Sequence, residues 1–253
     1  MEFNLTNPIA ERKTKTVYRD GDKTIKLFVE NYSKANILNE ALIQSRVEEN
    51  TDLKISRLLE VSKIQDRWAL VTEYVEGTPL DVLMKEYLEK EEEYLEFFVN
   101  VQMEVLSKRV PLLNRTKDKY KRKLTEAQNI DENAKYELLQ RLEGMKNHDK
   151  LCHGDFVPSN IIVKENGDYS IIDWSHATIG NASGDVANTF LLFTTEQKSE
   201  LAEKYVELYC KKTGTDKKEI QRWIPIVAAV RKTYNKPEEQ EFLNNWINIV
   251  DFQ

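Results

Sequence analysis

The sequence predicts an α+β protein of two lobes, in which a small antiparallel β-sheet with one helix precedes a mainly helical lobe. The first third of the chain contains short runs of β-branched and aromatic residues separated by turn signals, which is typical of strands. From residue 80 onward, apolar residues recur every three to four positions, which is typical of amphipathic helices. The period changes at Glu76-Gly77-Thr78-Pro79, where glycine and proline favour a break. We therefore expect lobes of residues 1–75 and 76–253, the first binding a nucleotide and the second carrying catalysis and the acceptor.

The N-terminal lobe is predicted to contain four strands and one helix. The turn signal Asp20-Gly21-Asp22 separates the first two strands and predicts a hairpin. The apolar spacing of Ile37–Val47 predicts the helix. The segment Thr6–Glu11, before the first strand, contains no glycine and is expected to form a loop. The predicted strands are Thr14–Arg19, Thr24–Phe28, Leu58–Val61 and Trp68–Val75.

The C-terminal lobe is predicted to be helical over most of its length. One long amphipathic helix is expected across Leu80–Val105, with the acidic run Glu89–Glu93 on its solvated face. Further apolar stripes predict helices at Tyr136–Met145, Leu201–Tyr209 and Ile220–Val227.

Composition and charge exclude several classes of function. A formal net charge of −6 is unfavourable for binding nucleic acid, which requires basic patches. Two cysteines, Cys152 and Cys210, provide neither a disulfide framework nor a closely spaced pair for zinc or redox chemistry. The first residues form no apolar signal-peptide core, and no apolar stretch has the length of a membrane span. We therefore expect a cytoplasmic protein that binds neither nucleic acid nor membrane.

The residues with most chemical information surround a second hairpin, predicted by Asn166-Gly167 between two short apolar runs. If these two residues form the whole loop, Asn160 and Asp173 lie directly opposite each other at the open end of the hairpin. Opposed side chains in an antiparallel pair point to the same face, about 4.5–5.5 Å apart at Cβ. An amide oxygen and a carboxylate placed in this way can share a hard cation such as Mg²⁺.

Asp155 precedes this hairpin by five residues, so its carboxylate is expected beside the metal-binding end. There it can accept the proton of an acceptor hydroxyl, and metal ligands with a proton acceptor are what phosphoryl transfer requires of a protein. Asp and Asn are also ordinary turn residues, and each of the three taken singly would favour that interpretation. Their combination with the hairpin favours a function.

These residues carry a resemblance to a known family. His153-Gly154-Asp155, then Asn160 and Ile171-Ile172-Asp173-Trp174, resemble the catalytic and metal motifs of aminoglycoside phosphotransferases and choline kinases. The later Gly184-Asp185-Val186-Ala187 resembles a further element of that family. The resemblance implies a protein-kinase-like fold and phosphoryl transfer from a nucleotide to a small molecule.

The resemblance also implies a role for each matching residue of the C-terminal lobe. Asp155 matches the catalytic base, and Asn160 and Asp173 match the ligands of Mg²⁺. His153 and Asp185 match residues that support the catalytic loop.

In the N-terminal lobe, the resemblance implies that Lys26 contacts the nucleotide phosphates and that Glu40 in the following helix is its ion-pair partner. Glu48 and Glu49 are the alternatives to Glu40 in the same helix.

The segment Leu70–Gly77 resembles the hinge of the family, where the backbone of Glu73 and Val75 would contact the purine. The chain departs from protein kinases in lacking both a glycine-rich loop before its first strand and a long activation segment ending in Ala-Pro-Glu. A protein substrate is therefore not expected.

Two groups of C-terminal residues are candidates for the acceptor site. Trp223, Tyr234 and Trp246 could bind a quaternary ammonium group through cation–π contacts, although the helical spacing of the two tryptophans favours core packing. The acidic cluster of Glu238, Glu239 and Glu241 could attract an amine or be solvated surface. The net negative charge is compatible with a cationic acceptor.

The sequence thus predicts a magnesium-dependent kinase that uses ATP or GTP to phosphorylate a hydroxyl group of an amino alcohol, sugar, polyol or aminoglycoside. The alternative is a catalytically inactive nucleotide-binding module of the same fold with a regulatory or scaffold role. The simultaneous presence of Lys26, Asp155, Asn160 and Asp173 argues for the enzyme.

Overall fold

The computed structural model describes residues 3–247, which fold as two compact units. The first unit comprises residues up to Leu88 together with Pro158–His176. The second unit comprises Glu89–Val157 and the residues from Ala177 onward. Within the described range, no helix combines the length and the apolar character needed to cross a membrane.

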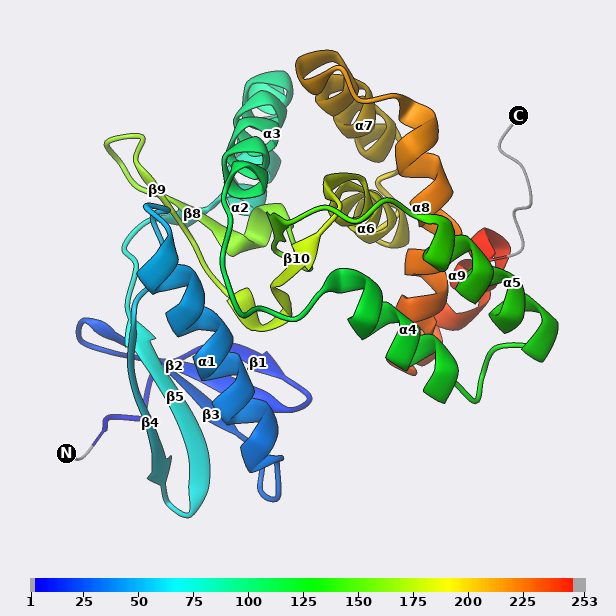
Figure 1. Ribbon diagram of the computed structural model, residues 1–253. Coiled ribbons are helices and arrows are strands. Elements are labelled where there is room, and N and C mark those ends of the chain that lie inside the picture. Colours follow the sequence, from blue (N-terminus) through cyan, green and yellow to red (C-terminus); the bar gives the residue numbers. More distant parts are fainter. Residues whose placement is uncertain (1–2, 248–253) are drawn as a thin grey trace. The chain divides into compact units, whose positions relative to one another are not determined.

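A five-stranded antiparallel sheet in the order β1-β2-β3-β5-β4 forms the core of the first unit (Figure 1). Helix α1 (Lys34–Asn50) packs on one face of the sheet, against Phe28 and Leu70. Ile25 and Leu27 belong to the opposite face, because successive side chains of a strand alternate. The same alternation turns residue 26 toward α1. The strands are β1 (Pro8–Arg12), β2 (Lys15–Asp20), β3 (Lys23–Phe28), β4 (Leu58–Ile64) and β5 (Arg67–Glu73).

This sheet confirms the four predicted strands and the helix, but the expected loop at Thr6–Glu11 is wrong. Pro8–Arg12 forms β1 and pairs with β2, and Lys13 and Thr14 make the turn between them. Proline is tolerated in β1 because the strand lies at the edge of the sheet and donates few ladder hydrogen bonds.

A small three-stranded sheet in the order β6-β8-β9 completes the first unit. Gly77 leads into it with φ of 141°, and a Cβ atom there would lie 2.4 Å from the carbonyl oxygen of Val163, so only glycine fits. The expected division of function at residues 75 and 76 stays a prediction. The elements are β6 (Thr78–Pro79), α2 (Leu80–Glu86), 3₁₀ helix η2 (Pro158–Asn160), β8 (Ile161–Val163), β9 (Tyr169–Ile171) and 3₁₀ helix η3 (Trp174–His176).

The β8–β9 hairpin is present, but its predicted register is wrong by one residue. Lys164 N–H donates to the carbonyl of Asp168 at 2.8 Å, so the loop contains three residues rather than two, with Gly167 at φ 79°. Ile172 N–H therefore donates to the carbonyl of Asn160 at 3.0 Å, and Asn160 does not face Asp173. Asp173 lies beyond the strand in a left-handed conformation, with φ of 61°.

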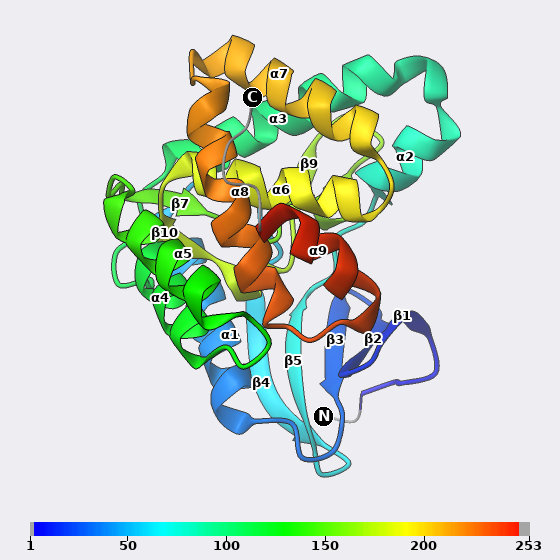
Figure 2. The same ribbon diagram turned by 90° about the vertical axis from the view of Figure 1, so that its right-hand side faces the viewer.

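The second unit is built mainly from helices around α6, which is buried along most of its length and packs against α7 and α8 (Figure 2). A two-stranded antiparallel sheet, β7 with β10, leads into and out of its functional loop. The elements are α3 (Glu91–Ser107), α4 (Thr116–Glu126), α5 (Glu132–Gly144), β7 (Lys150–Cys152), β10 (Thr178–Gly180), α6 (Ala182–Thr195), α7 (Ser199–Thr213), α8 (Lys217–Lys232), η4 (Pro237–Glu239) and α9 (Gln240–Ile247).

The single long helix expected across Leu80–Val105 is wrong. Helix α2 ends at Glu86, the 3₁₀ turn η1 (Leu88–Lys90) follows, and α3 begins at Glu91. Tyr87 and Leu88, which continued the apolar stripe in the sequence, are exposed, so no buried face holds one helix through this point.

Candidate active site

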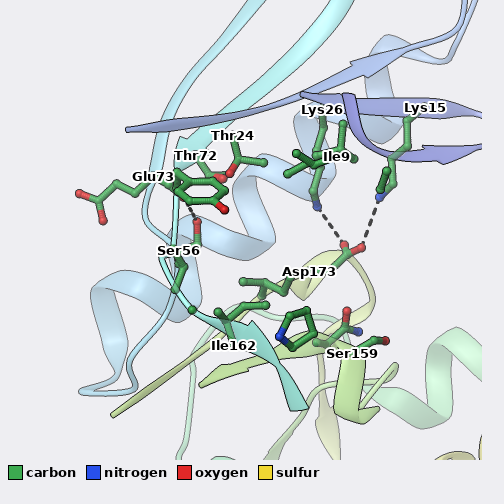
Figure 3. A pocket seen from close by; sticks show the side chains of 18 of the residues that line it. Ile9, Lys15, Thr24, Lys26, Ser56, Thr72, Glu73, Ser159, Ile162 and Asp173 are labelled. Atoms are coloured by element: carbon green, nitrogen blue, oxygen red, sulfur yellow. Dashed lines mark hydrogen bonds and ion pairs between the residues drawn. The ribbon is translucent and has the colours of Figure 1, made fainter. Parts of the chain in front are cut away.

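The first unit contains a cavity of about 480 Å³ between its two sheets, and its two sides differ in chemistry (Figure 3). One side is charged, where Lys15 and Lys26 both point toward Asp173. The other side is formed by Thr72 and Glu73 at the end of β5 and by the segment that follows. A charged end beside a mostly uncharged one suits a ligand that has phosphates at one end and a flat ring at the other.

Lys26 is held between two carboxylates on the charged side. Its Nζ donates to Glu40 Oε1 at 2.9 Å and to Asp173 Oδ1 at 3.0 Å, and the side chain is almost fully buried. Burial alone would lower the pKa of Lys26, but the charges of Asp173 and Glu40 outweigh it and raise that pKa. Lys26 is therefore a permanent cation, paired with Glu40 rather than with Glu48 or Glu49.

Lys15, on β2, is a site residue that the sequence did not reveal. Its Nζ donates to Asp173 Oδ2 at 3.3 Å, so the two oxygens of that carboxylate are bound to two different lysines. The register of the β2–β3 hairpin indicates why Lys15 belongs to the site. Val17 pairs with Lys26, and residues two apart on a strand share a face, so Lys15 lies on the face that carries Lys26.

Asp173 has the properties of a magnesium ligand. Burial would raise the pKa of its carboxyl, but Lys26 and Lys15 outweigh burial and lower it, so the group is ionised. Asn160 lines the same cavity and adds an amide oxygen. Carboxylate and amide oxygens, with water and phosphate completing the shell, fit Mg²⁺. The pair is thus brought to one cavity, although by a different register from the one predicted.

The expected hinge lines the other side of the cavity. The Glu73 carbonyl accepts from Ser56 Oγ at 2.6 Å, and the Glu73 N–H donates to the carbonyl of Arg57 at 2.9 Å. The Glu73 side chain instead forms an ion pair with Arg57, whose hydrogen bond lowers the pKa of that carboxyl. Within residues 3–247, the Val75 N–H has no hydrogen-bond partner, so it can donate to a purine nitrogen.

The second unit holds the other three predicted residues in the loop after β7 and at the start of α6. Asp155 N–H donates to Nδ1 of the fully buried His153 at 3.3 Å. Gly154 between them has φ of 78° and donates its N–H to Asp185 Oδ1 at 2.8 Å. The loop that carries Asp155 is therefore fixed by contacts at both of its preceding residues.

Asp185 is buried, and burial raises the pKa of its carboxyl, while the Gly154 N–H acts in the opposite direction. Asn188, one turn further along α6, donates its side-chain N–H to the Gly154 carbonyl at 2.9 Å. Helix α6 thus binds both the N–H and the C=O group of one glycine in the loop.

The candidate acceptor residues have different surroundings. Trp223 is buried, as expected for core packing, whereas Trp246 is half-buried and packs edge-to-face on Phe190 at 5.4 Å. Tyr234 instead lies beneath Lys123, with Nζ 4.3 Å from the ring centroid. Glu239 of the acidic cluster is buried and paired with Arg231 at 3.0 Å, so it is not a solvated attractant for amines.

Comparison with known families decides the class of protein. The model of the phosphotransferase enzyme family matches residues 9–222. The chain belongs to this family. It is a small-molecule phosphotransferase, and its antiparallel N-terminal sheet and mainly helical remainder are the protein-kinase-like fold that the sequence predicted.

Solved structures of similar fold include three informative examples. An aminoglycoside-3'-phosphotransferase of type VIII is 15% identical, with a TM-score of 0.65 over 90% of this chain and 93% of that chain. A thermostable mutant of the aminoglycoside phosphotransferase APH(4)-Ia, in a ternary complex with AMP-PNP and hygromycin B, is 13% identical, with a TM-score of 0.69 over 94% and 89%. The choline kinase LicA from Streptococcus pneumoniae is 15% identical, with a TM-score of 0.63 over 96% and 88%.

At these identities the structural likeness establishes the fold and not the acceptor. A search of curated proteins found no match.

Proposed function

We propose that this phosphotransferase moves the γ-phosphoryl group of a nucleotide, ATP or GTP, to a hydroxyl group of a small molecule in a magnesium-dependent reaction. The observation that carries the proposal is the arrangement around Lys26. A buried lysine bound to Glu40 and to an ionised Asp173 lies on one side of a cavity whose other side offers the Val75 N–H. A neighbour of the same fold solved with AMP-PNP and hygromycin B supports a nucleotide donor.

The nucleotide would lie in the cavity of the first unit. The Val75 N–H would donate to the purine edge, the Glu73 carbonyl would accept from it through its second lone pair, and Lys26 would bind the phosphates. Mg²⁺ held by Asp173 and Asn160 would neutralise charge on the phosphates during transfer. Lys15, whose Nζ is bound to Asp173, would add a second positive charge beside the phosphates.

Asp155 would act as the base. Its carboxylate would accept the hydroxyl proton of the acceptor as the hydroxyl oxygen attacks the γ-phosphorus. The bond from that phosphorus to the bridging oxygen would break, leaving a nucleoside diphosphate. His153 and Asp185 would keep the carboxylate in position through the backbone of residues 154 and 155.

A nucleotide-consumption screen tests the proposal. The protein is incubated with ATP or GTP and Mg²⁺ against choline, ethanolamine, sugars, polyols, aminoglycosides and hydroxy acids, and products are identified by mass. A phosphorylated acceptor is the expected result. Tight nucleotide binding with no product from any acceptor would contradict the proposal and favour the inactive regulatory or scaffold module.

A further inference from the structure

Helix α4 of the second unit is rich in positive charge, and its Lys119 lies near enough to Asp155 for their charges to interact. Helix α4, with the sequence TKDKYKRKLTE, contains five basic residues in eleven. Lys117 is occupied structurally, because its Nζ donates to the carbonyls of Glu143 and Met145 at 3.0 and 2.9 Å. Lys119 and Lys123 are half-buried and four residues apart, so their side chains lie next to each other on one face of the helix.

Cations outweigh carboxylates around Lys119. Burial, together with repulsion from Lys123 and Arg122, lowers its pKa to about 8. The carboxylates of Asp185 and Asp155 act in the opposite direction but do not compensate. Lys119 is therefore close enough to Asp155 to feel its charge, in surroundings where further negative charge would stabilise the lysine.

Tyr234 belongs to the same group. After burial, the charge of Asp155 is a cause of its raised pKa, while Arg231 acts in the opposite direction. The ring is already covered by Lys123 at 4.3 Å, so that face is not available to an ammonium group of a substrate.

Arg231 adds a second, independent observation. Its side chain is buried, and Nη2 donates to Glu239 Oε2 at 3.0 Å, but Nε has no hydrogen-bond partner among the described residues. Glu239 Oε1 also forms an ion pair with Lys236 Nζ at 2.9 Å, so one carboxylate neutralises parts of two positive charges. A buried guanidinium N–H without an acceptor costs free energy that a bound anion would recover.

We propose that the acceptor of this phosphotransferase carries an anionic group, a carboxylate or a phosphate, besides its hydroxyl, and that Lys119, Lys123 and Arg231 bind that group. The inference rests on the proposed function, because it concerns the acceptor of the same reaction. A cationic acceptor would be repelled by Lys119 and Lys123, and the ring of Tyr234 is already covered by Lys123. An anionic acceptor would balance their charge and orient its hydroxyl relative to Asp155.

The test uses four probes with one three-carbon framework: glycerol 3-phosphate, glycerate, glycerol and 3-amino-1,2-propanediol. Binding to the whole protein, saturated with AMP-PNP and Mg²⁺, is measured by calorimetry. We expect glycerol 3-phosphate or glycerate to bind at least tenfold more tightly than glycerol, and the amine more weakly than glycerol. The two anions distinguish a phosphate from a carboxylate. Equal or tighter binding of glycerol or the amine, or no anion binding at millimolar concentration, would overturn the inference.

Variants locate the site. Lys119→Met combined with Lys123→Met should weaken anion binding at least tenfold, whereas Lys119→Arg should retain it. Lys121→Met, on the exposed face of the same helix, removes one charge elsewhere and should bind as the wild type does. Unchanged anion binding in the double variant would also overturn the inference.

Titrating the wild-type protein with the four probes and no nucleotide, and separately with nucleotide alone, distinguishes the two proposals. Anion binding that depends on Lys119 and Lys123, in a wild-type protein that neither binds nucleotide nor phosphorylates any acceptor, would refute the proposed function and retain the anion site. Phosphorylation of an acceptor by a protein that binds none of the anionic probes would support the proposed function and refute the anion site.

Discussion

Two buried or half-buried lysines, one in each unit, have pKa values that are shifted in opposite directions. Lys26 in the first unit is enclosed by Glu40 and Asp173, and its pKa is raised despite burial. The pKa of Lys119 in the second unit falls to about 8, because burial and repulsion from Lys123 and Arg122 outweigh the carboxylates of Asp185 and Asp155. The difference lies in the balance of neighbouring charge rather than in the residue. A lysine enclosed by carboxylates stays charged, whereas a lysine that is buried beside other cations would be stabilised in its charged form by an added negative charge.

The largest effect is expected from Asp155→Asn, which tests the second unit. The amide keeps the shape of the side chain but cannot accept the hydroxyl proton, and loss of a general base costs about 10²–10⁴ in rate. Turnover should fall by that factor while the Kd of the nucleotide, measured by calorimetry, stays within about twofold. Asp66→Asn, on an exposed turn of the first unit, is the matched control and should keep full activity. Wild-type turnover by Asp155→Asn would show that another group takes the proton.

Lys26→Met tests the lysine of the first unit, whose charge is balanced by Glu40 and Asp173. It leaves the carboxylates of Glu40 and Asp173 without their shared amine, and breaking a buried ion pair costs roughly 3–5 kcal/mol. Because Lys15 still binds Asp173, we expect a loss at the lower end of that range, together with at least tenfold weaker nucleotide binding. Chemical denaturation and calorimetry measure the two quantities.

Glu40→Gln supplies the second half of a double-mutant cycle with Lys26→Met. Alone, it should also weaken nucleotide binding, because the Lys26 amine loses one of the two carboxylates that hold it. In the double variant the combined loss should be smaller than the sum of the two single losses, because both changes break the same contact. Additive effects of the two changes would show that the residues are not coupled.

Much of the first unit could be predicted because its information is local. The order of strand and helix placed Lys26 and Glu40 on neighbouring elements, and the structure joins them at 2.9 Å. The β8–β9 hairpin shows the limit of local information. Asn166-Gly167 predicts a turn, but glycine occurs in both two- and three-residue hairpin loops. The hydrogen bond from the Lys164 N–H to the Asp168 carbonyl, which sets the loop length, involves only backbone atoms and cannot be predicted from the residue types.

The acceptor side could not be predicted from the sequence because its residues come from distant segments. Helix α4 has only Tyr120 and Leu124 as buried apolar positions, too few for a clear periodic signal. Tyr234 was a candidate because it is aromatic, yet its partner Lys123 is 111 positions away, and only the folded chain brings them within 4.3 Å. The charge summed over the whole chain was compatible with a cationic acceptor, whereas the basic residues Lys119 and Lys123 of α4 are the basis for proposing an anionic one.

A smaller effect is expected from Lys15→Met. Lys15 is partly exposed and only assists Lys26 at the phosphates, so we expect roughly three- to tenfold weaker nucleotide binding with little change in stability. Lys13→Met removes an exposed charge from the adjacent turn and is the control. The loss should shrink as salt is raised, because screening weakens partly exposed interactions. Equal effects of the two variants would mean that only the general charge of the hairpin matters.

The smallest predicted effect is a pH dependence that sharpens the contrast between the two lysines. Lys119, with a pKa of about 8, is mostly charged at pH 7 and mostly neutral at pH 9, while Lys26 stays charged throughout. The KM for an anionic acceptor should therefore rise roughly threefold to tenfold over this interval, and the KM for the nucleotide should not.

Lys119→Arg, which keeps its charge, should flatten the pH profile of the acceptor KM. A rise in the acceptor KM with pH cannot be explained by unfolding that follows deprotonation of Lys119. The unfolded chain, with an ordinary lysine pKa of 10.5, binds more protons here than the folded chain between pH 8 and 10.5, so the contribution of Lys119 to the free energy of unfolding rises with pH. A flat acceptor KM in the wild type would show that Lys119 does not bind the acceptor, and the contrast with Lys26 would then be a feature of packing alone.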